Sequence, residues 1–143
     1  MKELIELLEH ENYSCIVEKQ GEIKHKVFGK GIRPLLNIYL KDKEDLKDSN
    51  VADKVIGKAA AVILVLGKTK NVYAKLLSKR ALVFLKNYEI NVSYNVIVDE
   101  IQNMSGTGIC KMEELVKDIA EPQEALDSIL EYIINQKNNN VVI

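Results

Sequence analysis

The sequence contains no tryptophan and only two phenylalanines, and aromatic residues make up 6% of its 143 positions. Proteins that bind single strands stack bases on exposed rings along a basic groove, and the tyrosines here are scattered. Lys and Arg number 20 against 21 Asp and Glu, which leaves a formal net charge of -1. No basic surface is indicated, so we expect neither nucleic acid nor an anionic membrane as a partner.

Cysteine is scarce as well, and long apolar runs are absent. Cys15 and Cys110 lie far apart, without the spacing of a disulfide framework or a zinc ribbon, which favours a cytoplasmic location. The longest apolar run, AAAVILVL at 59–66, is far shorter than the roughly 20 residues of a membrane span. The start, MKELIELLEH, lacks the basic flank and apolar run of a signal peptide.

What is present is ordinary globular composition, with 47% hydrophobic and 29% charged residues. A chain of this length fits one domain with a sizeable core. We expect a single domain over 1–137 and a flexible polar tail over 138–143.

Hydrophobic spacing predicts an amphipathic helix over 2–10, followed by a hairpin with strands 14–18 and 23–28 around Gln20-Gly21. The remaining pattern alternates. The expected helices are 35–40 (after Pro34), 51–63, 78–87, 111–119 and 122–136, and the expected strands are 71–77 and 92–98. Such alternation predicts right-handed crossovers and a partly parallel sheet covered by helices.

Three motifs are more specific than this order of elements. GKGIRPL at 29–35, VADKVIGKAAA at 51–61 and SGTGICKMEE at 105–114 together resemble a small uncharacterised prokaryotic family with a cytidine deaminase-like fold. The resemblance implies an α/β domain with three layers, α/β/α, and a mixed sheet in which an antiparallel hairpin precedes parallel β-α-β units.

Zinc deaminases of that superfamily carry His or Cys, Ala and Glu at one helix start and Pro-Cys-x-x-Cys at the next. Here these motifs would fall on 51–53 (VAD) and 77–81 (LSKRA). Valine and alanine do not ligate metals, a serine hydroxyl is a poor zinc ligand, and His10 and His25 lie outside both positions. Zinc-dependent deamination is therefore disfavoured, and no metal is expected there. The pocket, which in the superfamily accommodates a nucleobase and sugar, would remain.

The resemblance places Asp53 near the position of the proton-carrying glutamate. Asp53 could bind a ligand by accepting a hydrogen bond from a ribose or base, or on the predicted helix could equally form a capping pair with Asn50. Lys54 and Lys58, four residues apart, could offset a bound anion or form a solvated face. Gly57 would cost about 1 kcal/mol in a helix interior, so we expect a packing or ligand reason for it.

The Gly-rich turn before residue 111 could cradle a phosphate with its hydroxyls and backbone N–H groups, or could only start a helix. The candidate ligand-binding residues there are Ser105, Gly106, Thr107 and Gly108. Cys110 follows, either as a nucleophile activated at a helix start or as an inert buried thiol. Arg33 offers a fork for an anion, or is equally an ordinary surface arginine. Ser78 is at the start of a predicted helix. Lys79 and Arg80 follow it, and because cations are unfavourable at a helix amino end, they suggest a nearby negative group.

These residues favour a metal-independent binding or regulatory protein for a nucleotide or nucleotide-sugar, with no cofactor. One alternative is a metal-independent enzyme with Asp53 or Cys110 as the reactive group. A second alternative is a homo-oligomeric scaffold.

Overall fold

A computed structural model describes the backbone of residues 1–142 and the side chains of residues 1–138. It contains a five-stranded sheet with the strand order β2-β1-β3-β4-β5. The strands are β1 (Cys15–Lys19), β2 (Glu22–Val27), β3 (Asn50–Ile56), β4 (Asn71–Ser78) and β5 (Asn91–Val98). β1 runs antiparallel to β2 and β3, whereas β3, β4 and β5 are parallel. The predicted α/β class with a mixed sheet is thereby confirmed.

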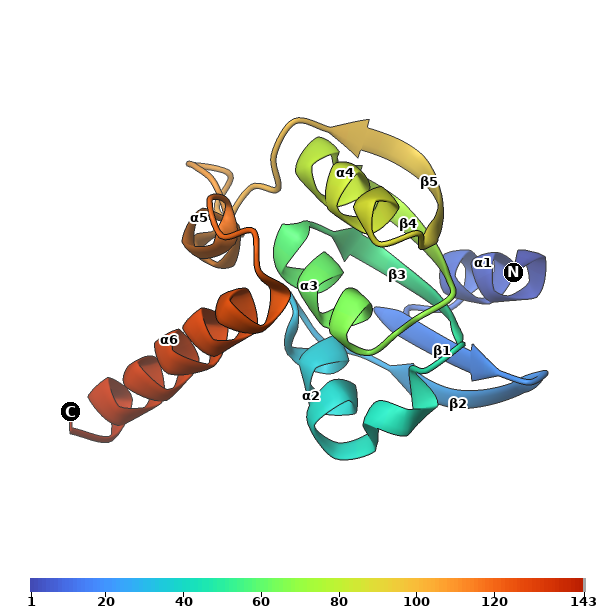
Figure 1. Ribbon diagram of the computed structural model, residues 1–143, viewed down its shortest axis with the longest axis horizontal. Coiled ribbons are helices and arrows are strands. Elements are labelled where there is room, and N and C mark those ends of the chain that lie inside the picture. The colour runs from blue at the N-terminus through green and yellow to red at the C-terminus, as the bar shows by residue number, and fades with distance from the viewer. Residues whose placement is uncertain (143) are drawn as a thin grey trace.

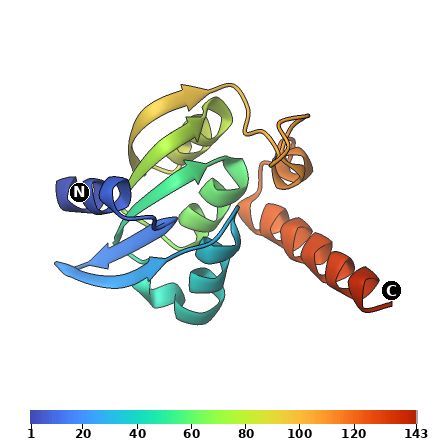
Figure 2. The ribbon, with the colours of Figure 1, turned by 180° about the vertical axis from the view of Figure 1, so that it is seen from behind.

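Helices cover both faces of this sheet (Figures 1 and 2). They are α1 (Lys2–His10), α2 (Arg33–Asp42), the 3-10 helix η1 (Lys43–Asp45), α3 (Lys58–Leu66), α4 (Lys79–Asn87), α5 (Lys111–Val116) and α6 (Pro122–Val142). α1 lies alone on one face, and α2, α3 and α4 lie on the other with α3 in the middle (Figure 1). α6 packs against α3 at its start and then extends away from the sheet.

The N-terminal hairpin forms as the sequence predicts. Gln20 and Gly21 both adopt left-handed backbone conformations, with φ of 54° and 80°. Two consecutive positive φ values define the tight turn whose twist matches that of the strands it joins. Because Gly21 occupies the second of these positions, one of the two turn residues takes the conformation without steric cost.

The predicted helix over 51–63 is wrong in its first half, which is the strand β3. α1 covers one face of β3 and α3 covers the other, so Val51 and Ala52 are both fully buried despite pointing in opposite directions. A strand buried on both faces loses its polar alternation. Only Gly57 separates this apolar strand from the buried helix α3, and the two read together as one long helix.

Asn50 is therefore not a helix cap. It begins β3, and Asn71 and Asn91 begin β4 and β5 at the same register positions. The Asn71 amide donates to Asn50 Oδ1 at 2.7 Å, and the Asn91 amide donates to Asn71 Oδ1 at 3.0 Å. This asparagine row fixes the register of the three parallel strands at their amino ends.

The last two helices differ in length from the prediction. α5 ends at Val116 rather than near residue 119, and α6 continues past residue 136 to Val142. The tail predicted over 138–143 overlaps this helix, and its last residue lies outside the described part of the chain. None of the described helices is long and apolar enough to cross a membrane.

The main core lies between the sheet and the α2–α4 layer, and a second, smaller core lies under α1. The smaller one contains Leu4, Leu8, Ile16, Ala52 and Tyr73. Leu4 and Leu8 lie one helical turn apart, so both point from α1 onto the sheet. The third layer of the fold therefore depends on a few leucine contacts.

We expect Leu8→Ala, which removes a side chain that is 1% exposed, to lower the free energy of unfolding by about 2–5 kcal/mol. Leu40→Ala on α2 is the matched control, because that leucine is 55% exposed and should cost little. Urea unfolding of both variants measures the difference, and equal losses would mean that α1 does not pack as described.

Candidate functional site

The carboxyl ends of β3, β4 and β5 meet at one edge of the sheet, and α3 and α4 begin at that edge. Crevices outside the carboxyl ends of parallel strands are the usual ligand sites of α/β sheets. The Ser78 hydroxyl caps α4 by accepting a hydrogen bond from the Ala81 N–H at 3.1 Å. Asp99 and Glu100 follow β5 directly and bring carboxylates to the same edge.

The amino end of α3 is capped by a residue from a distant helix. Both oxygens of the Glu113 carboxylate accept backbone hydrogen bonds, from Lys58 N at 2.6 Å and Ala59 N at 2.9 Å. A Cβ on Gly57 would overlap this carboxyl group. Gly57 therefore leaves the space that the Glu113 carboxylate occupies, which is a packing reason for this glycine, one of the two kinds expected from the sequence.

Glu113 is 5% exposed. Burial raises its pKa, whereas the N–H groups of Ala59 and Lys58 and the nearby Arg80 act in the opposite direction. Because both oxygens accept from N–H donors, the contacts fit the ionised form, which complements the helix dipole. The place that an anionic ligand could take at α3 is thus filled by the protein itself.

Lys58, in the first turn of α3, is buried beneath the same edge. Its ammonium group donates to the carbonyl oxygens of Ile119 at 2.7 Å and Lys117 at 3.2 Å, and lies 5.4 Å from the centre of the Phe84 ring. Burial and, secondarily, the positive charge of Arg80 lower the pKa of Lys58. These contacts tie the segment after α5 to the start of α3 and, through Phe84, to the middle of α4.

A cleft of about 780 Å³ opens beside these groups along α4. It is lined by Lys58, Lys79, Arg80, Val83, Phe84, Asn87, Tyr88, Asp99 and Ala120. Arg80, Phe84 and Tyr88 are spaced four residues apart, so they lie along one face of the helix. The cleft therefore has cations at its α4 amino end and aromatic rings towards the other.

The cations at the amino end are paired with the carboxylates after β5. Lys79 Nζ lies 2.7 Å from Asp99 Oδ1, and Arg80 Nη1 lies 3.9 Å from Glu100 Oε1. All four side chains are at least 36% exposed. Exposed ion pairs contribute little to stability, so a ligand anion could replace these carboxylates at small cost.

Asp53 does not lie at a helix start, so the predicted capping role is wrong. It lies in β3 opposite Cys15 of β1, is 7% exposed, and accepts from the Val55 N–H at 3.1 Å. Burial raises the pKa of Asp53 to about 7, against the hydrogen bonds from Val55, the Cys15 thiol and Lys54. It is not among the residues that line the cleft.

Lys54 and Arg33 also lie away from the cleft. Lys54 belongs to β3 and donates to Asn12 Oδ1 at 2.7 Å, so it does not share a helix face with Lys58. Arg33 is exposed at the start of α2, which α3 separates from α4 (Figure 1). Of the sequence-predicted ligand residues, Lys58 lines the cleft, and Ser78 caps the helix along which it runs.

The Gly-rich loop forms its polar contacts within itself. Asn103 Oδ1 accepts hydrogen bonds from Thr107 N at 3.1 Å and from the Ser105 hydroxyl at 3.0 Å. The hydroxyl oxygens of Ser105 and Thr107 lie 2.9 Å apart. Gly106 has a φ of 70°, which the turn requires. No hydrogen bond joins this loop to Asp53 within the described chain, and the predicted phosphate role of 105–108 stays a prediction.

Cys110 is the N-cap residue of α5 and is half buried. α5 has only six residues, so its dipole is weaker than that of the longer helix predicted from the sequence over 111–119. Among the residues that the structure describes, no hydrogen bond joins the Cys110 thiol to a group that could act as its general base. A catalytic role for Cys110 likewise stays a prediction.

Comparison with known families places the chain. The model of a domain of unknown function, DUF1893, matches residues 3–134. The chain belongs to the DUF1893 family. The crystal structure of a DUF1893 family protein from Thermotoga maritima is similar, with 26% sequence identity and a TM-score of 0.85 over 92% of this chain and 88% of that one. The predicted membership of an uncharacterised family is confirmed.

A second solved structure, a diaminohydroxyphosphoribosylaminopyrimidine deaminase/5-amino-6-(5-phosphoribosylamino)uracil reductase from Thermotoga maritima, shares 16% identity. It covers 66% of this chain and 35% of its own at a TM-score of 0.46, and we base no argument on it. No curated protein matches the sequence.

In this DUF1893 chain, the helix start after β3 is Gly57-Lys58-Ala59 rather than 51–53. Glycine and alanine side chains at this helix start offer no metal ligand. The capping role of Glu113 was not predicted from the sequence. The N–H groups that its carboxylate caps, those of Ala59 and Lys58, lie 54 and 55 residues away along the chain. The Lys79-Arg80 pair was the available signal, and it does mark the cationic end of the cleft.

We expect Glu113→Gln to lower the free energy of unfolding by about 1–3 kcal/mol, because the amide leaves one N–H of α3 facing another donor. Glu114→Gln is the matched control, since that neighbour on α5 is exposed. Urea unfolding of the two variants at neutral pH makes the comparison. Equal free energies of unfolding for the two variants would show that the Glu113 carboxylate does not cap α3.

Asp53 should make stability depend on pH in a defined direction. Because its pKa rises from an ordinary 3.8 to about 7 in the folded protein, the folded state holds the proton more tightly than the unfolded state. The contribution of Asp53 to stability is complete below about pH 4 and declines as the pH rises towards 7, by about 1.4 kcal/mol per unit.

Asp53→Asn removes this titration. The stability of the wild type relative to the variant should therefore fall by about 2 kcal/mol between pH 5 and pH 7. Urea unfolding at both pH values measures this difference in the free energy of unfolding. Asp48→Asn, at an exposed position, is the control for removing a carboxylate. A difference that does not change with pH would show that the carboxyl group of Asp53 is not titrating in this range.

Proposed function

We propose that the cleft along α4 binds a small anionic molecule that carries a planar ring, and that a nucleotide or nucleotide-sugar is the ligand class. The observation that carries the proposal is the arrangement of the lining. Lys79 and Arg80 stand at one end of the cleft, and the rings of Phe84 and Tyr88 stand further along the same helix. Phosphate and base need these two kinds of partner at two ends of one site.

The dimensions support this class of ligand. Residues 80 and 88 are eight positions apart on a helix, which corresponds to about 12 Å along its axis. The volume of about 780 Å³ lies within the usual range of small-molecule pockets, about 300–1,000 Å³. An extended nucleotide can therefore place its phosphates at the cationic end while its base reaches the aromatic end.

Each lining residue has a chemical role in this arrangement. The Arg80 guanidinium can grip a phosphate with two parallel hydrogen bonds once it releases Glu100. Tyr88 is 45% exposed and offers a ring face for stacking, whereas Phe84 is 8% exposed and already lies under Lys58. Asn87 supplies both a donor and an acceptor for the edge of a base.

The proposal requires binding rather than turnover. The lining residues hold and orient a ligand, and the candidates for catalysis inferred from sequence, Asp53 and Cys110, are not among them. DUF1893 is a family of unknown function. The ligand class proposed for this protein therefore rests on the cleft and not on the family.

Isothermal titration with a panel of nucleoside mono- and diphosphates tests the proposal. We expect wild-type binding, and Arg80→Gln should weaken it about tenfold or more, since a charge-assisted hydrogen bond contributes about 1.5–3 kcal/mol. Tyr88→Leu should weaken binding of nucleotides and leave inorganic pyrophosphate less affected.

Arg33→Gln is the matched control, because it removes the same charge from an exposed site on α2. It should leave affinity unchanged at constant ionic strength. Equal effects of the Arg33 and Arg80 substitutions would assign any binding to overall charge, and no binding to the wild type would end the proposal.

A further inference from the structure

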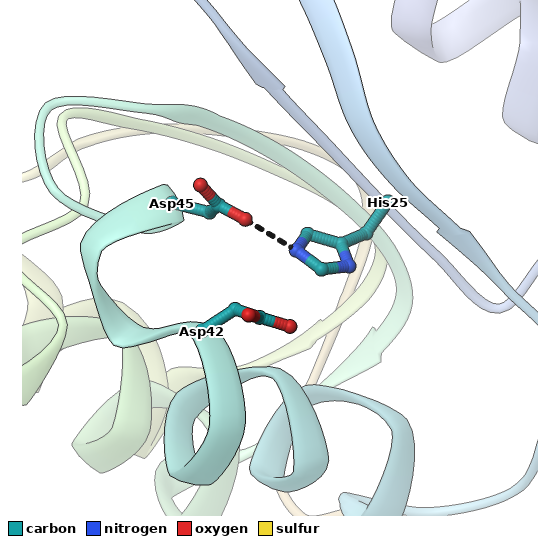
Figure 3. A group of neighbouring side chains, drawn as sticks. All are labelled: His25, Asp42 and Asp45. Carbon is teal, nitrogen blue, oxygen red and sulfur yellow. Dashed lines mark hydrogen bonds and ion pairs between the residues drawn. The ribbon is translucent and has the colours of Figure 1, made fainter.

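A second group of ligating side chains lies outside the cleft, between β2 and the turn after α2. One ligand atom each from His25, Asp42 and Asp45 lies within 4.8 Å of the other two, and the three side chains converge (Figure 3). We propose that these residues form a binding site for one divalent transition-metal ion of the Zn²⁺ type.

The backbone prepares this convergence from two sides. β2 has an irregular register beside His25, where Val17 pairs with His25 but Glu18 pairs with Ile23. A bulge of this kind re-aims a side chain and is a designed feature of sheets. The hairpin thus turns the imidazole towards the α2–η1 turn.

The two aspartates come from the other side. Asp42 ends α2 and Asp45 ends η1, three residues later. Asp42 precedes η1 with a non-helical backbone conformation (φ -135°, ψ 47°), and its carboxylate converges with that of Asp45 on His25 (Figure 3). The Lys19 ammonium donates to the Glu44 carbonyl at 2.6 Å and fixes this turn against the hairpin. The site is therefore built before any ion arrives.

The distances and charges fit a metal ion. His25 Nε2 and Asp45 Oδ2 are 2.8 Å apart, and a widening of about 0.5 Å would give the roughly 3.3 Å that separates neighbouring ligands of a tetrahedral ion at about 2.0–2.1 Å from each. A neutral imidazole and two carboxylates carry a charge of about -2, which a divalent ion balances. Nitrogen ligation favours Zn²⁺, Cu²⁺ or Ni²⁺ over Mg²⁺ and Ca²⁺, which prefer oxygen alone.

An ion pair between His25 and Asp45 alone would explain two of the three residues. The exposed Asp42 carboxylate makes no hydrogen bond or ion pair with any residue that the structure describes, so it is available as a third ligand. Asp42 and His25 also line one cavity of about 210 Å³, together with Asn37 and Lys41. The exposed Lys41 can swing into solvent, and water can complete the coordination from this cavity.

A bound ion would cross-link β2 to the α2–η1 turn, a role separate from the cleft at the opposite end of the helical layer. Because the ion binds only the folded arrangement, a concentration one hundred times the Kd should shift the folding equilibrium about 100-fold towards the folded state. The proposal stands or falls independently of nucleotide binding.

Titration of tag-free, chelator-treated protein with Zn²⁺ by calorimetry tests the site. We expect one ion per chain, and about a tenfold or larger loss of affinity in Asp42→Asn and in His25→Ala. Asp42→Asn is the decisive variant, because the Asp42 carboxylate has no hydrogen bond to lose and the metal-free melting temperature should stay unchanged. Glu44→Gln, in the same 3-10 turn but outside the cluster, should bind Zn²⁺ as the wild type does.

Mg²⁺ at the same concentration should neither bind measurably nor raise the melting temperature. Failure of the wild type to bind Zn²⁺ would overturn the proposal. So would Zn²⁺ binding that persists unchanged in Asp42→Asn, because the ion would then be held elsewhere, for example by Cys110 or His10. An equal loss in Glu44→Gln would reduce the effect to general acidity and would also overturn it.

Discussion

The Glu113 carboxylate on the amino end of α3 is the contact on which this edge of the molecule depends. It joins α5, late in the chain, to the start of α3, and it occupies the space left by the missing side chain of Gly57. Lys58 reinforces the junction by donating to carbonyl oxygens of the segment between α5 and α6. The cap therefore positions the wall of the cleft that Ala120 contributes.

Because of this contact, the amino ends of α3 and α4 differ in how their positive charge is balanced. At α3 the protein supplies its own anion, buried and doubly hydrogen-bonded, so the dipole of that helix is already complemented. At α4 a neutral serine hydroxyl is the cap, and the positive charges of Lys79 and Arg80 are met only by exposed carboxylates. A buried cap is costly to displace and an exposed ion pair is not, which directs an incoming anion to α4.

Much of the fold could be predicted from the sequence because local signals were strong. The hairpin turn, α4 between two strands, and Pro34 and Pro122 at helix starts all follow from neighbouring residues. β3 could not be predicted in the same way, because burial on both faces erased the alternation that marks a strand. That single error moved Asp53 from a strand interior to an imagined helix start and created a site around it.

The site was less predictable than the fold because its parts are joined by tertiary contacts. Lys58 was found through its charge, and Lys79-Arg80 through their conflict with the helix dipole. Glu113 sits in the first turn of α5, where a local reading assigns it to its own helix. The His25 cluster was passed over because its residues are 17 and 20 positions apart, with no motif spacing.

Amide chemical shifts during titration with a nucleoside diphosphate would test the central claim, that the α3 start is filled by the protein and the α4 start is open. We expect shifts in the amides of 79–88 and of Asp99 and Glu100, whereas the amides of Lys58 and Ala59 stay bound to Glu113 and change little. Large shifts at Lys58 and Ala59, or shifts confined to 105–108, would contradict it.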